Sequence, residues 1–168
     1  MRFPSRSPEQ TFAAARLLAA AIDEHGLVVS LVGPLGAGKT VFAKGLAAGL
    51  GVDEAAVASP TFVIASEYRI RGGGHLAHVD LYRVESREEL EATGFADLLG
   101  LGSVMVVEWA DRFPDALPVD RLVVEISRPD SGASPDAREL HALSSGAVSE
   151  AALERWSNAL AGASGGSR

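Results

Sequence analysis

The 168-residue sequence predicts a single α/β domain in which helices flank a mixed sheet of parallel and antiparallel strands. Two apolar, β-branched segments, LVVSLV at 27–32 and SVMVVEW at 103–109, are typical of strands that are buried on both faces. Two alternating segments, 62–70 and 75–84, enclose the turn RGGG and therefore indicate an antiparallel hairpin. The hydrophobic content of 47% is enough to give such a chain a sizeable core.

The first predicted helix precedes these strands. It should run from Pro8 to about His25 and end at Gly26. Its N-cap is Ser7, and Gln10 completes a capping box. This helix and the one that follows the first strand should cover the faces of that strand.

Three further helices are expected over 39–50, 86–94 and 149–160. Gly51 ends the first of these, a serine–glutamate capping box begins the second, and Ser149 caps the third.

The remaining segments complete the predicted domain. Two strands are expected at 121–127 and 138–144, on either side of a polar loop. Residues 1–160 should then form one domain, followed by a flexible C-terminal tail over 161–168.

The composition excludes several classes of function. The formal net charge of −7 argues against unaided, non-specific binding to nucleic acid or to an anionic membrane. The chain has no cysteine, which excludes a disulfide scaffold or a thiolate metal site. Arg2 and Arg6 precede an apolar run, 12–22, as in a secretory signal, but Arg16 interrupts that run. No segment reaches the roughly 20 apolar residues of a membrane span. We therefore expect a soluble, cytoplasmic protein.

The strongest functional signal is the segment GPLGAGKT, with the pattern Gly33-x-x-x-x-Gly38-Lys39-Thr40. It follows a predicted buried strand and opens a predicted helix, which is the context of a phosphate-binding loop (P-loop). The backbone N–H groups of such a loop form a cradle for anions. Gly36 and Gly38 have no Cβ, so the phosphates can approach this cradle closely. Lys39 reaches the β- and γ-phosphates, and Thr40 offers its hydroxyl to Mg²⁺. Without a nucleotide, we expect the Lys39 ammonium to be solvated.

Two acids at the ends of apolar strands are candidates to serve the metal ion and the phosphates. Asp80 ends HLAHVD and Glu108 ends SVMVVE, and ligands of such sheets bind beside the carboxyl ends of the strands. A solvent-exposed acid at a strand end is the alternative for each. Thr61, which follows Pro60, is a candidate sensor of the γ-phosphate, or else a turn residue that bonds its own backbone.

The class of nucleotide enzyme is narrowed by what the sequence lacks. A GTPase is rejected because guanine recognition uses an Asn-Lys-x-Asp element, and the single asparagine, Asn158, lies in the last predicted helix. A small-molecule kinase remains open because RIRGGG, at 69–74, imitates an arginine-bearing lid, although its setting favours a hairpin tip.

Five segments in order, GPLGAGKT, SPTFVIASEY, HVDLYRV, EELEATGF and VVEWADR, resemble the bacterial TsaE (YjeE) family from about Ser7 to Arg112. The resemblance implies a P-loop NTPase-like domain that hydrolyses ATP with Mg²⁺. It also implies that the protein assists the TsaB–TsaD pair, which forms N6-threonylcarbamoyladenosine at position 37 of tRNAs reading ANN codons. TsaD and TsaB are then the partners, and tRNA is contacted only through their complex.

The resemblance implies roles for individual residues. Thr40 and Glu108 would hold Mg²⁺. Asp80 would be the acid needed for hydrolysis, and Trp109 an aromatic companion of the metal-binding acid. The candidate catalytic residues are Lys39, Thr61, Asp80 and Glu108. The residues expected to contact ATP are Glu9, Leu35, Gly36, Ala37, Gly38, Lys39, Thr40 and Val41.

Two matters stay open in the sequence. The family carries a late arginine that contacts the nucleotide, but the loop SGASPDAR differs here, so Arg128, Arg138 or neither fills that role. Two other functions also compete with the ATPase reading. They are a small-molecule P-loop kinase and an ATP-gated docking module in which hydrolysis is incidental.

Overall fold

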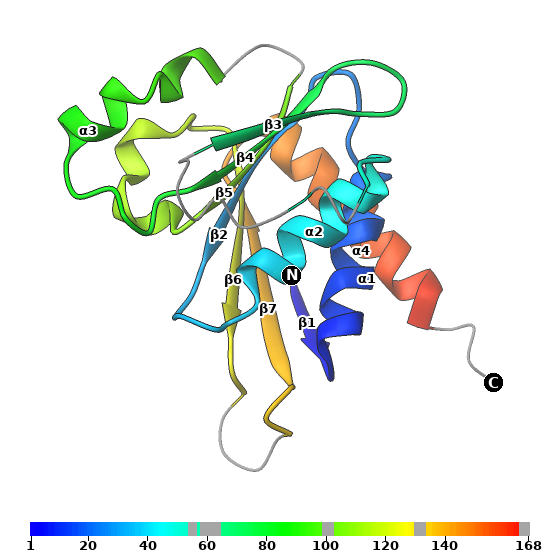
Figure 1. Ribbon diagram of the computed structural model, residues 1–168. Coiled ribbons are helices and arrows are strands. Elements are labelled where there is room, and N and C mark those ends of the chain that lie inside the picture. The colour runs from blue at the N-terminus through cyan, green and yellow to red at the C-terminus, as the bar shows by residue number, and fades with distance from the viewer. Residues whose placement is uncertain (54–56, 58–64, 99–102, 130–133, 165–168) are drawn as a thin grey trace.

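The computed structural model describes residues 1–53, 57, 65–98, 103–129 and 134–164. They form one α/β domain with a seven-stranded mixed sheet and flanking helices (Figure 1), which confirms the predicted fold class. The strands are β1 Arg2–Ser5, β2 Leu27–Val32, β3 Ala65–Arg69, β4 His75–Asp80, β5 Val104–Glu108, β6 Leu122–Ser127 and β7 Arg138–Ser144. The α-helices are α1 Pro8–Ala19, α2 Lys39–Gly49, α3 Arg87–Ala92 and α4 Ala147–Ser164. The described residues also include the 3₁₀ helices η2 Phe95–Leu98, η3 Ala110–Arg112 and η4 Pro114–Ala116.

The sheet has the strand order β1-β7-β6-β2-β5-β4-β3. Its four middle strands, β6, β2, β5 and β4, run parallel, and the outer pairings are antiparallel. β2 lies between β5 and β6, so the loop after it leaves from the centre of the carboxyl edge. The predicted hairpin is confirmed for β3 and β4, whose register pairs Arg69 with His75. Residues 62–64 of the predicted strand lie outside the described residues.

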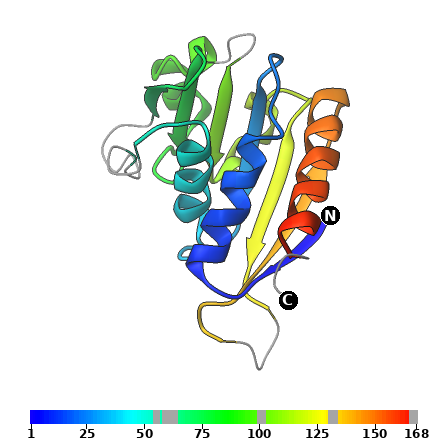
Figure 2. The same ribbon diagram turned by 90° about the vertical axis from the view of Figure 1, so that its right-hand side faces the viewer.

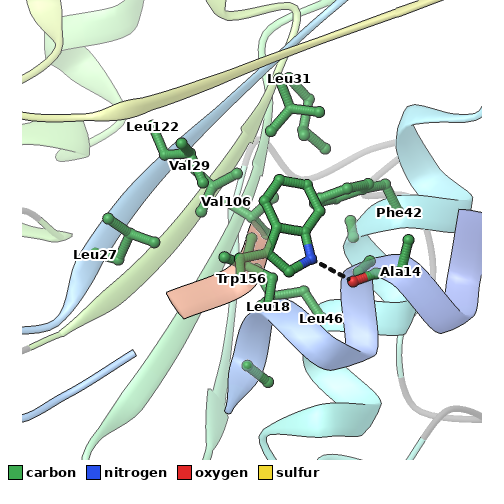
Figure 3. Close-up of a cluster of buried hydrophobic side chains, with 14 of the residues drawn as sticks. Ala14, Leu18, Leu27, Val29, Leu31, Phe42, Leu46, Val106, Leu122 and Trp156 are labelled. Carbon is green, nitrogen blue, oxygen red and sulfur yellow. Dashed lines mark hydrogen bonds between the residues drawn. The ribbon is translucent and has the colours of Figure 1, made fainter. Parts of the chain in front are cut away.

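One face of the sheet is covered by α1, α2 and α4, which lie side by side in Figure 2. Trp156 of α4 is fully buried at the centre of this layer (Figure 3). Its indole N–H donates to the Ala14 carbonyl at 2.8 Å, and its ring meets Phe42 edge-on at 5.8 Å between centroids. The helices before and after β2, α1 and α2, therefore lie on the same face of the sheet (Figure 2). The sequence had led us to expect that these helices cover the faces of the strand.

The other face has a separate, smaller core. Its strand residues include Val79 of β4 together with Met105 and Val107 of β5. Leu90 of α3 and Phe95 of η2 pack onto this cluster, as does Ala110 of η3. The alternation of side chains along β4 and β5 therefore sends every second residue to each of two cores, and Val104–Glu108 is buried throughout.

Two element ends, those of α1 and β4, differ from the sequence prediction. α1 ends at Ala19 rather than at His25. Arg155 of α4 donates to the Ala21 carbonyl at 2.8 Å, and the Asp23 carboxylate accepts the His25 N–H at 3.0 Å. These contacts replace the bonds that would continue the helix. β4 ends at Asp80, whereas the sequence predicted a strand up to Val84; after Asp80 the chain leaves the sheet.

α4 is longer than predicted at both ends. It begins at Ala147, because the carboxylate of Asp120 accepts the N–H groups of Val148 and Ser149, each at 2.9 Å. Ser149 is therefore inside the helix, and its hydroxyl accepts N–H groups from the preceding turn at 3.1 Å. The helix continues to Ser164, past the predicted end at Leu160. β1, which pairs with β7, was not predicted.

The predicted serine caps are confirmed at α1 and α3. The hydroxyl of Ser7 accepts the Gln10 N–H at 3.3 Å, and the hydroxyl of Ser86 accepts the Glu89 N–H at 3.1 Å. The return bond differs from a standard capping box, since the Gln10 and Glu89 side chains each reach the residue before the cap, at 2.7 and 2.8 Å. Among the described residues, no helix is both long and apolar enough to cross a bilayer.

Candidate functional site

The glycine-rich loop joins the end of β2 to the start of α2. Gly33 has a φ of +143°, and a Cβ there would collide with the Ile126 carbonyl of β6. Gly38 is the N-cap of α2 with a φ of +108°, and the helix has no side-chain cap at this end. The loop is thus held close to the neighbouring strand, and its path needs a residue without a side chain at both positions.

Lys39 is buried in this structure, which corrects the expectation that its ammonium is solvated. The residue is only 5% exposed. Its Nζ donates to the carbonyls of Gly33 at 2.6 Å and Pro34 at 3.0 Å, and it lies 3.5 Å from the centroid of the Trp109 ring. The lysine is therefore folded back onto its own loop and held under an aromatic face.

The electrostatic surroundings of Lys39 act in two directions. Burial lowers the pKa of the Lys39 ammonium, because the charged form loses hydration. The carboxylates of Glu108, Asp111 and Asp80 act in the opposite sense and raise it, with Glu108 the strongest of the three. The net pKa of Lys39 is lowered, so its charge is held against a desolvation cost.

Trp109 has a backbone conformation that is unusual for a bulky residue. Its φ is +60° and its ψ is +37°, and it caps η3 directly after β5. Its ring also lies against Tyr82, with 4.9 Å between centroids and 39° between ring planes. Lys39, Trp109 and Tyr82 form one stack at the carboxyl edge. Strained backbone is concentrated at functional sites, which makes this left-handed turn a reason to look for function here.

Thr40 and Glu108, the predicted metal-binding pair, lie together. The Thr40 hydroxyl donates to Glu108 Oε2 at 2.9 Å, across 68 positions of sequence. Glu108 is 2% exposed, so its carboxylate is buried rather than a solvent-facing strand end. Its other oxygen, Oε1, is 2.9 Å from Nε2 of His78, which is fully buried. Sequence reasoning missed His78. The available signal was the two-residue period of β4, which puts His78 and Asp80 on one face.

Asp80 lies beside Glu108, because the two residues are register partners on the parallel strands β4 and β5. Its Oδ1 accepts the Tyr82 N–H at 2.9 Å, and the Leu81 N–H donates to the Glu108 carbonyl at 3.1 Å. The two acids therefore meet at one edge, as the sequence predicted from the strand ends.

Arg138, at the start of β7, reaches the loop from a distant part of the chain. Its Nε donates to the Ala37 carbonyl at 2.9 Å and its Nη2 to the Gly36 carbonyl at 3.2 Å. Nη1 donates to two carbonyls of its own loop, those of residues 135 and 137, at 2.7 Å each. Of the two late arginines considered from sequence, Arg138 contacts the loop, whereas Arg128 is exposed.

For the other residues predicted at the site, the structure gives a position in the fold or an exposure, and one of them is not described. Thr61 lies outside the described residues. Glu9 is in the first turn of α1, where the Ser7 hydroxyl lowers the pKa of its carboxyl. The Leu35 side chain is 75% exposed at the tip of the loop. Ala37 is buried, and Val41 is half-buried in α2.

The residues at this edge fit an Mg²⁺ ion. Hydroxyl and carboxylate oxygens are the ligands that this hard cation prefers, and Thr40 and Glu108 bring one of each together. Within the described ranges, no three His, Asp or Glu side chains gather to form a complete metal cage. In many Mg²⁺ sites, one or two protein ligands are completed by water and phosphate oxygens.

A central parallel strand, a glycine-rich loop and a helix in direct succession define an α/β protein with a P-loop motif. The family model of TsaE, described as threonylcarbamoyl adenosine biosynthesis protein TsaE, matches residues 5–139. The chain therefore belongs to the TsaE family of threonylcarbamoyladenosine biosynthesis proteins.

Individual relatives agree with this assignment. The TsaE protein of Bacillus subtilis is 41% identical over 140 residues, which is 83% of each chain. That of Haemophilus influenzae is 33% identical over 135 residues, 80% of this chain and 81% of the relative. The crystal structure of Bacillus subtilis YdiB superposes with a TM-score of 0.72 at 36% identity, covering 94% of both chains. Both predictions, of family and of fold class, are confirmed.

Proposed function

We propose that this protein is a Mg²⁺-dependent ATPase that assists TsaB and TsaD in forming N6-threonylcarbamoyladenosine at position 37 of tRNAs reading ANN codons. The observation that carries the proposal is the hydrogen bond from the Thr40 hydroxyl, at the start of α2, to Oε2 of Glu108, at the end of β5, with 2.9 Å between the two oxygens. Family membership supports the role in tRNA modification.

The loop residues 35–41 bind the phosphates of ATP through their backbone N–H groups and the N-terminus of α2. Lys39 leaves the carbonyls of Gly33 and Pro34 and turns to the β- and γ-phosphates. That exchange is favourable because charge-assisted hydrogen bonds to phosphate are stronger than those to neutral carbonyls. Thr40 and Glu108 hold Mg²⁺, which neutralises phosphate charge when it is bound.

Asp80 is the candidate that orients the attacking water. It lies opposite Glu108 in the register, and the Tyr82 N–H fixes its carboxyl group from behind. Because Glu108 serves the metal, the second carboxylate is available for hydrolysis. Thr61 and Glu9 complete the proposed site, as γ-phosphate sensor and as a contact near the base. Arg138 holds the carbonyl side of the loop in place.

The proposed partners are TsaD and TsaB, and the protein contacts tRNA through their complex in the cytoplasm. The net charge of −7 supports this arrangement, because direct binding to the phosphate backbone needs a basic surface. The kinase alternative is disfavoured by the segment RIRGGG. Residues 69–74 form the tip of the β3–β4 hairpin, where Ile70 and Gly74 bond across the turn.

The deciding experiment uses Asp80→Asn. The variant should keep much of its ATP affinity or even bind more tightly, because repulsion between the carboxylate and the phosphates is relieved, while turnover falls. It should associate with TsaB–TsaD in ATP yet fail to support repeated rounds of tRNA modification. Asp115→Asn, the same change at an exposed acid of η4, is the matched control.

Two outcomes would redirect the proposal. Normal repeated modification by a hydrolysis-dead Asp80→Asn protein would leave an ATP-gated docking module. Loss of ATP binding would instead place Asp80 among the metal ligands. Release of phosphate by the wild type without any added acceptor distinguishes an ATPase from a small-molecule kinase.

A further inference from the structure

His78 is a buried, titratable side chain to which the proposed ATPase mechanism assigns no role. It lies in β4, two residues before Asp80, and its side chain is 0% exposed. Nε2 is 2.9 Å from Glu108 Oε1, and Nδ1 has no hydrogen-bond partner among the described residues. Leu76 and Val106, which lie on the same face of the sheet, are apolar core residues, so packing alone does not require a histidine at this position.

The geometry fixes which nitrogen carries the proton. A carboxylate accepts hydrogen bonds, so the Nε2 atom that faces Glu108 is the donor. In a neutral imidazole one nitrogen carries the proton and the other is an acceptor, so Nδ1, which is buried without a partner in the described part of the chain, is the acceptor. His78 is therefore an Nε2–H donor directed at a single oxygen of Glu108.

The two carboxylate oxygens of Glu108 have different hydrogen-bond partners. Oε1 accepts from His78 inside the sheet, and Oε2 accepts from Thr40 at the start of α2. A bond on Oε1 limits rotation of the carboxylate plane, so that Oε2 stays directed towards the loop. In the proposed function, Oε2 is the atom that would bind Mg²⁺.

We propose that His78 is a positioning residue that holds Glu108 Oε1 and thereby directs Oε2 at the Mg²⁺ site. The inference rests on the proposed function, because it takes Glu108 to be the metal ligand. Partners that hold a metal ligand in this way contribute to affinity for the metal, and losing one weakens binding by about 10- to 100-fold.

The competing explanation is that the His78–Glu108 pair serves folding only. Two substitutions of similar polarity separate these explanations. The amide nitrogen of glutamine reaches about as far as Nε2 of histidine, whereas that of asparagine is shorter by one methylene and reaches about as far as Nδ1. His78→Gln should keep the bond to Oε1, and His78→Asn should lose it while presenting the same amide group to the core.

The experiment is a Mg²⁺ titration at a fixed concentration of a fluorescent, non-hydrolysable ATP analogue, so that no turnover is needed. For His78→Asn we expect the Mg²⁺ midpoint to rise about 10- to 100-fold. For His78→Gln it should stay within about threefold of the wild type. Binding of the analogue in EDTA should be the same in all three proteins, because Glu108 does not act there. Thermal unfolding without ligand shows that each variant is folded.

A double-mutant cycle completes the test. If His78 acts only through Glu108, then His78→Asn should change the Mg²⁺ midpoint no further in a Glu108→Gln background. Equal Mg²⁺ midpoints for the wild type and His78→Asn, with a raised midpoint for Glu108→Gln, would overturn the positioning role and leave the proposed function intact. A wild type whose binding does not depend on Mg²⁺ would overturn both.

Discussion

The helices α2 and α4 begin in opposite ways, although both pack on the same face of the sheet. At α4 the carboxylate of Asp120 accepts two N–H groups of the first turn, at 2.9 Å each. At α2 the N-cap is Gly38, which has no side chain, and the first turn contains no acidic residue. Both ends carry the same need for acceptors, since the first N–H groups of any helix lack a partner within it.

The difference indicates what each end is for. An end that is capped by its own chain stabilises the fold and has nothing left for a ligand. An end without a cap keeps its N–H groups available, and the positive end of the helix dipole favours an anion there. Glycine at an N-cap costs a helix roughly a few tenths of a kcal/mol compared with serine or aspartate, so α2 gives up about that much stability at Gly38. This difference supports the proposed binding of phosphate at α2.

The largest expected effect is at the uncapped end. Lys39→Ala should abolish useful ATP turnover, because each charge-assisted hydrogen bond to phosphate contributes about 1.5–3 kcal/mol. About 1.4 kcal/mol corresponds to a factor of ten in rate, so loss of two such bonds lowers turnover roughly 100-fold or more. The measurement is steady-state phosphate release. Wild-type turnover in this variant would contradict the assignment of the P-loop.

Glu108→Gln should have the next largest effect. A neutral amide is a poorer ligand for a hard cation than a carboxylate, so binding of ATP in the presence of Mg²⁺ should weaken about tenfold or more. In EDTA the two proteins should bind ATP alike. An equal loss with and without Mg²⁺ would show that this buried acid is structural.

A substitution at the capped end of α4 should lower the stability of the protein and leave its ATP turnover unchanged. Asp120→Ala leaves the Val148 and Ser149 N–H groups without their acceptor, and the free energy of unfolding should fall by about 1–2 kcal/mol. ATP turnover of the folded protein at low temperature should not change. Urea unfolding and phosphate release are measured on the same preparation, and a large loss of turnover would break the division between the two ends.

The smallest expected effect concerns pH. Burial lowers the pKa of Lys39 below its ordinary value of 10.5, so between the lowered pKa and 10.5 the unfolded chain binds more protons than the folded one. The nucleotide-free protein should therefore gain stability as the pH rises through this window. Lys39→Met should lack that gain. Urea unfolding at a series of pH values up to 10.5 measures it, and parallel curves would show that the lysine is not desolvated in solution.

The sequence alone determined the parts of this protein that depend on neighbours along the chain. The apolar strands 27–32 and 103–109, the glycine-rich loop and the serine caps of α1 and α3 are local patterns, and each was predicted close to its observed place. The two strand-end acids were also found this way, because parallel strands bring their carboxyl ends to one edge.

Only the tertiary structure decided the rest, because those features join residues that are far apart in the chain. Arg155 occupies the Ala21 carbonyl and ends α1 early, and Asp120 begins α4 before its own serine. Arg138 reaches the loop across 101 positions. The bond between His78 and Glu108 depends on strand register and on burial together, and no spacing in the sequence specifies either of these. The buried Lys39 has the same origin, since Trp109 and the loop carbonyls meet it only after folding.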